Sequence, residues 1–250
     1  MLTLFVDISS TRIILFTLKN RKINNLEKIV LPVGTIVNDK VILNDVVKSY
    51  INTYKRRKFI NKVNLIIKPR AIIRFVSYPI LKRSHLHSAV QYSLSDHFPV
   101  NINEYTIDYE ILSTTDTINV MIAAVKTEII QSYMQIVKNI NSLDLAQNFI
   151  TKQIGKLNNN NIITCVPYNN DVIIQHLQFG IVTSFVETDC TNLDRLFSRY
   201  ININGDIDIK KAFVQLGTNE ILIDYILSKN IEIIFFEEVY ESFDIRLRGA

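Results

Sequence analysis

The sequence predicts an α/β fold in which hairpin-rich sheets are covered by crossover helices. One observation is that short runs of β-branched and aromatic residues alternate with segments whose apolar residues recur at helical spacing. A second is that the strand-rich opening pattern returns after a polar run at 158–161. A chain of 250 residues is long enough for two lobes. We therefore expect a duplicated architecture with lobes at 1–157 and 158–250.

The first half opens with strands that are followed by a helix. The predicted helix has one apolar face, made of Val46, Val47, Tyr50, Ile51 and Tyr54, and Asn44 stands where an N-cap residue is expected. The predicted strands are 2–6, 13–18, 29–33 and 63–68, and the predicted helix is 44–57.

The stretch 68–112 changes its hydrophobic period three times. Residues 71–78 have strand composition, and Pro79 ends this strand because proline cannot donate to a ladder. A helix over 84–97 follows, and it ends before Pro99 because the residue preceding a proline is pushed out of the α region. The predicted elements that come next are strands at 104–112 and 117–125 and helices at 126–140 and 143–157.

The second half repeats the arrangement of hairpin and crossover. Its predicted strands are 162–166, 172–177, 182–186, 211–216 and 231–236, and its predicted helices are 192–199, one starting at 207, and 219–227.

The order of residues in the stretch 68–112, and in the strand that follows it, resembles the small inserted domain of the PilM family. These are actin-like cytoplasmic proteins of type IV pilus assembly, related to the cell-division protein FtsA. The resemblance implies an actin-like, ribonuclease H-like fold of two lobes, with a small domain inserted at about 68–126. It also implies a reduced second lobe, because 185–211 has room for only one helix and a turn. The residues that carry the resemblance are Pro69, Arg74, Pro79, Leu81, Phe98, Pro99, Glu104, Asp108 and Tyr109, followed by Ala123, Ala124, Val125 and Lys126.

In this family ATP lies between the lobes, held by three loops. The first loop corresponds here to Asp7, Ser9, Ser10, Thr11 and Arg12, with serine where the family has glycine. An ordinary hairpin closed by an Asx-turn is the alternative interpretation of these residues.

The other two loops are also altered. The second, at 165–170, lacks both its acid and its glycine, and Tyr168 would enter the phosphate space. The third keeps Gly217, with Thr218 as a plausible N-cap. We therefore expect no cofactor and no hydrolysis, with weak binding of ATP and Mg²⁺ as the alternative.

The family's inserted domain and first lobe grip the N-terminal cytoplasmic tail of the membrane protein PilN as an extended peptide. The resemblance therefore implies a scaffold of a type IV pilus, secretion or competence machine, which could also contact the assembly ATPase. The alternatives are an ATP-binding switch or filament-forming actin relative, and a cleft enzyme of sugar-kinase descent.

The candidate tail-binding residues are Arg74, Phe75, Tyr92, His97, Phe98 and Tyr105. For Phe75 and Phe98, the alternative role is to fill the hydrophobic core.

Composition limits the other classes of function. A formal charge of +4 makes neither acidic lipid nor nucleic acid the default partner, and no apolar run approaches the roughly 20 residues that cross a bilayer. Cys165 and Cys190 have no metal-binding spacing, so we expect free thiols, a cytoplasmic location and membrane attachment through partners. No nucleophile–base motif or metal-ligand pattern is present in the sequence. The basic run 55–58 suits a helix C-terminus, with contact to acidic headgroups as the alternative.

Overall fold

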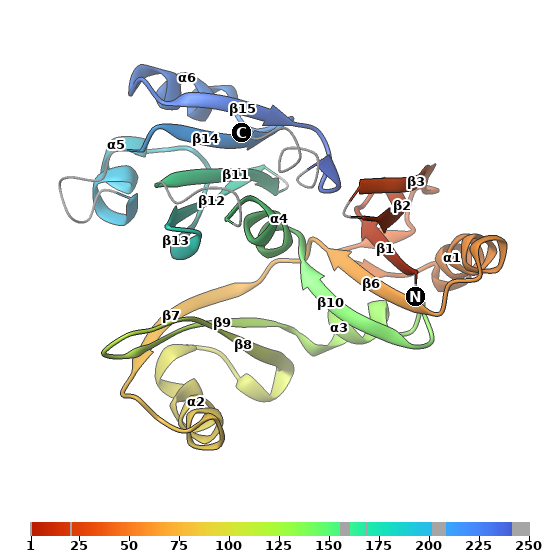
Figure 1. The fold of residues 1–250 in the computed structure, drawn as a ribbon, viewed down its shortest axis with the longest axis horizontal. Helices are drawn as coiled ribbons and strands as arrows, with labels where there is room; N and C mark the ends of the chain where they lie inside the picture. Colours follow the sequence, from red (N-terminus) through yellow and green to blue (C-terminus); the bar gives the residue numbers. More distant parts are fainter. Residues whose placement is uncertain (1, 21, 156–160, 169, 202–208, 242–250) are drawn as a thin grey trace. The chain divides into compact units, whose positions relative to one another are not determined.

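The computed structural model describes residues 2–20, 22–155, 161–168, 170–201 and 209–241 (Figure 1). Its internal contacts divide the chain into two compact units. The first unit comprises Met1–Leu15 and Glu27–Leu143, and the second comprises Phe16–Leu26 and Asp144–Ala250. The lobe limits predicted from the sequence stay predictions.

The first five-stranded sheet has the strand order β10-β6-β1-β2-β3. β1 and β6 run parallel, with Thr3 beside Lys62 at one end and Ile8 beside Ile67 at the other. Their inward residues are fully buried. The strands are β1 (Thr3–Ile8), β2 (Arg12–Lys19), β3 (Lys22–Val30), β6 (Lys62–Ile67) and β10 (Ile140–Leu145).

Helix α1 (Asn44–Lys58) leads into β6. It buries Val47, Ile51 and Tyr54 of the predicted face, whereas Val46 and Tyr50 stay partly exposed. The predicted N-cap is wrong: Leu43 holds the cap position without a side-chain bond, and Asn44 is already helical. The side chain of Asn44 instead contacts the C-cap residue of helix α3 (Thr127–Met134), since its Nδ2 donates to Gln135 Oε1 at 3.2 Å. A short hairpin of β4 (Ile36–Val37) and β5 (Lys40–Val41) precedes α1, and α3 packs beside β5.

A separate three-stranded sheet forms the small domain, drawn in yellow and green in Figure 1. Its order is β7-β9-β8, and helix α2 covers one face. Leu86, Val90 and Leu94 of α2 are buried against this sheet, as their spacing predicts. The elements are β7 (Ile72–Tyr78), α2 (Arg83–His97), a 3₁₀ turn (Ile102–Glu104), β8 (Tyr105–Thr114) and β9 (Ile118–Lys126).

The second five-stranded sheet has the order β13-β12-β11-β14-β15. Helices α5 and α6 contribute Leu193, Leu222 and Ile226 to the cluster on one face, and α4 lies against β12. The elements are α4 (Ala146–Gly155), β11 (Ile162–Tyr168), β12 (Asp171–Gln178), β13 (Ile181–Thr188), α5 (Leu193–Leu196), a π-helical turn (Phe197–Ile201), β14 (Lys211–Gln215), α6 (Glu220–Ser228) and β15 (Glu232–Phe236).

Three predicted elements differ from the structure. The helix expected at 126–140 ends at Met134, and the start of the next predicted helix is instead strand β10. A left-handed residue, Asn139, precedes this strand, and Asn141 Nδ2 donates to Asn64 Oδ1 of β6 at 2.8 Å. The third strand begins at Lys22, well before the predicted 29, because left-handed Asn20 permits an earlier turn.

The remaining predicted elements are confirmed to within a few residues, apart from the helix expected from 207. Residues 207–208 lie outside the described residues, and 209–210 are not helical. Within the ranges that the structure describes, no helix combines the length and hydropathy needed to cross a bilayer.

Candidate functional site

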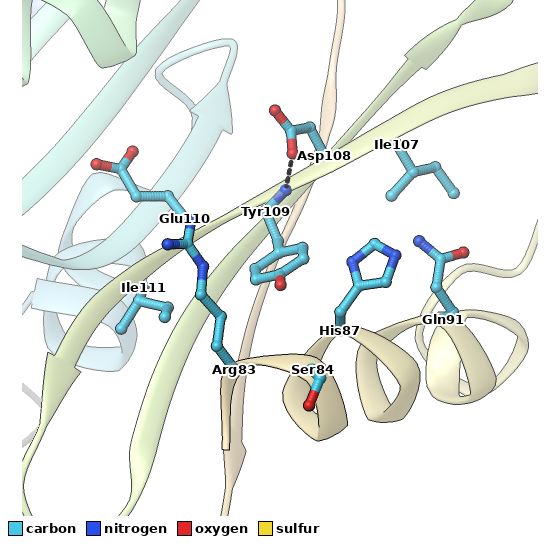
Figure 2. A pocket seen from close by; sticks show the side chains of 9 residues that line it. All are labelled: Arg83, Ser84, His87, Gln91, Ile107, Asp108, Tyr109, Glu110 and Ile111. Carbon is cyan, nitrogen blue, oxygen red and sulfur yellow. Dashed lines mark hydrogen bonds between the residues drawn. The ribbon is translucent and has the colours of Figure 1, made fainter. Parts of the chain in front are cut away.

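A groove of about 780 Å³ lies between α2 and β8 in the small domain (Figure 2). α2 provides one wall because Arg83, His87 and Gln91 are four residues apart and so share a helical face. β8 provides the other wall. The lining residues are Arg83, Ser84, His87, Gln91, Ile107, Asp108, Tyr109, Glu110 and Ile111.

The two walls differ in chemistry. The α2 wall carries a guanidinium, an imidazole and an amide, whereas the β8 wall carries apolar and acidic side chains. The rings of His87 and Tyr109 lie 6.0 Å apart, centroid to centroid, across the groove. Figure 2 shows the guanidinium of Arg83 pointing toward Glu110 at one end of the groove. The groove can therefore accept a partly apolar ligand that also carries hydrogen-bonding groups.

β8 is an edge strand as well as a groove wall. In the sheet order β7-β9-β8, only β9 pairs with it, and no strand in the described part of the chain pairs with its outer edge. An exposed edge presents backbone N–H and C=O groups that can pair with an extended chain. Such an edge beside a side-chain groove has the geometry used for peptide binding by strand addition.

Three of the predicted tail-binding residues, Arg74, His97 and Phe98, contact one another at the C-terminal end of α2. Arg74 Nε donates to the carbonyl oxygen of His97 at 3.1 Å, and Arg74 Nη1 donates to the carbonyl oxygen of Ile73 at 2.9 Å. Its guanidinium carbon also lies 5.9 Å from the ring centroid of the buried Phe98. Arg74 therefore caps the last turn of α2, where carbonyl groups lack helical partners.

The other three predicted residues lie on different surfaces. Tyr105 packs against the core under α2. Tyr92 is 86% exposed on the side of α2 opposite to Val90. Phe75 is partly exposed on the sheet face opposite to α2, because it alternates with Val76, which contacts the α2 core.

None of the six predicted residues lines the groove. A sequence signal for the groove did exist, namely the four-residue spacing of Arg83, His87 and Gln91 opposite the alternating Ile107, Tyr109 and Ile111. Only the packing of α2 on the sheet shows that these two patterns face each other.

The hairpin between β1 and β2 holds the residues predicted for the first phosphate loop. Ser9 N donates to the carbonyl oxygen of Arg12 at 3.0 Å, and Arg12 N donates to Ser9 Oγ at 3.3 Å. Ser9 Oγ in turn donates to the Arg12 carbonyl at 3.2 Å. Ser10 and Thr11 are exposed at the tip. The backbone and hydroxyl of Ser9 are thus used to close the turn.

Asp7 lies before this turn, buried in β1. Burial raises the pKa of its carboxyl, and the charges of Lys68 and Arg12 oppose that rise. Its Oδ1 atom has no hydrogen-bond partner among the described residues. Asp7 is therefore a costly buried group, of the kind that proteins retain at functional sites.

The second and third predicted loops meet within the second unit. Residues 165–168 of the second loop belong to strand β11, in which the buried Tyr168 pairs with Asp171. Gly217 has a positive φ of 90°, and Pro167 Cγ would lie 3.9 Å from a Cβ atom added there. The backbone thus keeps the glycine conformation, while a proline ring lies beside it.

The predicted cap of the following helix is wrong. Thr218 Oγ1 donates back to the carbonyl oxygen of Gln215 at 2.6 Å. The cap of α6 is instead Asn219, whose Oδ1 accepts from Ile221 N at 2.9 Å. The hydroxyl is unavailable for capping because it completes the preceding turn.

Asp194 and the two cysteines are ionisable groups whose pKa values are shifted by their neighbours or by burial. A hollow beside α5 and α6 contains Asp194, whose carboxylate accepts from Tyr225 and Lys229 at 3.0 and 3.2 Å; these bonds lower its pKa. Burial raises the pKa of Cys165 and of Cys190. Among the described residues, no three His, Cys, Asp or Glu side chains cluster as a metal site would require.

Comparison with known proteins identifies the fold. No protein-family model and no curated protein sequence matches the chain. A chain of the PilM-PilN type IV pilus biogenesis complex matches its structure with a TM-score of 0.73 and 13% identity, over 99% of this chain and 98% of that chain.

Two further structures match less closely. A Bacteroides thetaiotaomicron protein with an actin-like ATPase fold has a TM-score of 0.56 and 11% identity, over 98% of this chain and 95% of its own. The ethanolamine utilization protein EutJ from Carboxydothermus hydrogenoformans has a TM-score of 0.51 and 7% identity, over 97% and 87%. The PilM-like, actin-like fold predicted from the sequence is thereby confirmed.

Proposed function

We propose that this actin-like protein is a cytoplasmic scaffold of a type IV pilus or related secretion or competence machine, and that it binds the tail of a PilN-like membrane protein. The observation that carries the proposal is the structural match, over nearly the whole of both chains, to a chain of the PilM-PilN complex. Attachment to the inner membrane through that partner, and contact with the assembly ATPase, belong to the same proposal.

The groove between α2 and β8 is the proposed tail-binding site. An extended tail would pair with the free edge of β8 through its backbone, which gives affinity independent of sequence. Because successive side chains of an extended chain point to opposite sides, alternate tail residues would enter the groove. Ile107 and Ile111 favour apolar side chains there, and Arg83 favours an acidic or carbonyl group at the end of the groove.

The proposal includes a degenerate nucleotide site. Ser9 closes its own hairpin, and Pro167 stands beside Gly217. Each charge-assisted hydrogen bond lost from a phosphate site costs about 1.5–3 kcal/mol of binding free energy, so loss of several removes useful affinity. We expect no detectable Mg-ATP binding in calorimetry, and low-micromolar binding would contradict this expectation.

A second candidate function is an ATP-binding switch or filament-forming protein. The observation that favours it is the buried Asp7, retained beside Lys68 and Arg12 although one of its oxygens has no partner. Mg-ATP titration of the wild type and of Asp7→Asn separates the two functions. Binding that disappears in the variant would support the switch.

The tail-binding site is tested with a synthetic N-terminal tail of a PilN-like protein and the full chain. Ile111→Glu places a charge in the groove and is expected to weaken tail binding at least about tenfold, since burial of a charged group is costly. Ile80→Glu is the matched control, because Ile80 is an exposed isoleucine of the same domain outside the groove.

Tyr92→Ala with Arg74→Ala tests the alternative site predicted from the sequence. If that double variant abolishes binding while Ile111→Glu does not, the tail lies over the outer side of α2. If the tail binds neither the wild type nor any variant, the scaffold function itself is wrong.

A further inference from the structure

The C-terminal end of α1 carries a concentrated positive charge. Five of the eight residues from 55 to 62 are lysine or arginine, and none is acidic. Arg56, Arg57, Lys58 and Lys62 are all exposed. Attraction to the helix dipole accounts for cations near the last carbonyl groups. It does not account for Lys62, which begins β6 beyond the helix.

Arg57 is used within the fold. Arg57 Nη2 donates to both carboxylate oxygens of Glu27, at 2.9 and 3.2 Å, and its guanidinium lies over the ring of Tyr54. This pair joins the helix end to β3. Arg57 therefore holds the helix end in place.

An aromatic residue protrudes from the centre of this charge. Phe59 is 92% exposed and has left-handed backbone angles of φ 52° and ψ 47°. Glycine or asparagine is the usual residue in this position after a helix, because other side chains are strained there. Ile60 donates its N–H back to the carbonyl of Lys55 at 3.2 Å and is itself buried. The turn is thus anchored by Ile60, and Phe59 points outward.

We propose that Lys55, Arg56, Lys58, Phe59 and Lys62, the helix-end patch, bind the surface of an anionic phospholipid bilayer. Clustered lysine and arginine are attracted to anionic headgroups, and an apolar ring can enter the boundary between headgroups and acyl chains. The combination of both at one protruding turn fits a soft, extended, negatively charged surface. This contact goes beyond the proposed scaffold function, because it needs no membrane protein partner.

The shape of the patch favours a bilayer over other acidic partners. The grooves reported above lie between α2 and β8 and beside α5 and α6, and neither includes a residue of the patch. An acidic peptide is usually held by pockets for its side chains. Single-stranded nucleic acid is usually held by several stacking rings along a groove. A single phenylalanine that is 92% exposed at a helix end, outside both grooves, suits insertion better.

The helix-end patch and the predicted first phosphate loop lie at opposite ends of the first sheet. Lys62 pairs with Thr3 at the amino end of the parallel strands β1 and β6, whereas Asp7 pairs with Ile66 near their carboxyl end. A bilayer at the helix-end patch would therefore contact the opposite end of this sheet from the β1–β2 hairpin.

Flotation of the full chain with vesicles tests the proposal. Vesicles of phosphatidylglycerol and phosphatidylcholine in equal parts should bind the wild type, more weakly as salt is added, and vesicles of phosphatidylcholine alone should not. Arg56→Gln with Lys62→Gln should lower the partition coefficient about 25-fold, which is about fivefold for each charge.

Phe59→Gly separates binding from folding. Glycine relieves the left-handed strain, so the melting temperature should rise while vesicle binding falls several-fold. Phe179→Gly is the matched control, since Phe179 is 72% exposed and also left-handed but lies between Gln178 and Gly180. It should leave vesicle binding unchanged.

Three results would overturn the proposal. The first is equal binding to both kinds of vesicle. The second is undiminished binding by the charge variant or by Phe59→Gly. The third is a preference for single-stranded DNA over anionic vesicles that is lost in the same variants, which would assign the patch to nucleic acid.

Discussion

The sheet β10-β6-β1-β2-β3 and the sheet β13-β12-β11-β14-β15 have equivalent strand orders but different buried polar groups. At the end of β1, Asp7 is buried with one oxygen unpartnered. In the second sheet, Thr151 Oγ1 of α4 donates to Gln175 Oε1 at 2.6 Å and lies 3.4 Å from Thr164 Oγ1.

This difference indicates how the two halves of a repeated fold have diverged. Mutually bonded polar groups in a core add specificity of packing, whereas an unpartnered buried carboxylate costs stability. The second sheet bonds Thr151, Thr164 and Gln175 to one another, although it also buries His176 Nε2 and Ser184 Oγ without a partner among the described residues. The first sheet retains Asp7, whose burial cost is partly opposed by the charges of Lys68 and Arg12. Three measurements test this comparison, beginning with the largest expected effect.

The packing of α4 on the second sheet depends on two glycines. A Cβ atom at Gly155 would lie 2.8 Å from the carbonyl oxygen of Gly180 and 3.2 Å from Leu177 Cδ2. Gly155→Ala should therefore lower the free energy of unfolding by about 3 kcal/mol, measured by urea denaturation. Gly34→Ala, in the first unit, should cost only about 1 kcal/mol, because only its positive φ of 82° resists the change. Equal effects would contradict this role of the contact.

The pH dependence of stability should distinguish the two sheets next. Burial in β12 lowers the pKa of His176 from 6.5 to about 4. Between these values the unfolded chain binds a proton that the folded chain does not, so stability falls as pH falls. The loss from this group should be about 2 kcal/mol between pH 7 and pH 5.

His176→Gln removes that titration and serves as the comparison. Between pH 7 and pH 5, the unfolding free energy of the variant should fall by about 2 kcal/mol less than that of the wild type. Identical pH profiles for wild type and variant would mean that His176 is already accessible to protons in the folded state.

The smallest expected effect concerns Asp7 and has the opposite sign. Its raised pKa means that the folded chain keeps a proton that the unfolded chain has released, so its contribution becomes less favourable as pH rises above 3.8. Asp7→Asn should therefore increase stability at pH 7 by about 1 kcal/mol, and the gain should disappear as pH falls toward 4. A loss of stability at pH 7 would show that attraction to Lys68 and Arg12 outweighs the cost of burial.

The positions of most elements could be predicted because local chemistry decides them. Pro79 and Pro99 delimit β7 and α2, and the apolar spacing of Leu86, Val90 and Leu94 predicts the buried face of α2. β10 could not be found in this way. It becomes a strand because an edge of the first sheet is available beside β6, and local propensity yields to such pairing.

The candidate site was less predictable than the fold. Arg74 has the chemistry of an interface residue, but the end of α2 lies within reach of its guanidinium and uses its donors. Ile111 has nothing unusual in sequence, yet it lines the groove because β8 is an edge strand next to α2. A residue's type states which bonds it can make, and its neighbours decide which of them form.

The sequence by itself determined the positions of most strands and helices, the resemblance to an actin-like family and the altered phosphate loops. These depend on periodicity, on proline and glycine, and on residue identity at single positions. Only the tertiary structure decided that the groove lies between α2 and β8, that Ser9 closes its own turn, and that Phe59 protrudes from a basic helix end. Those features depend on which distant segments pack together, and packing is set by the summed burial of many side chains.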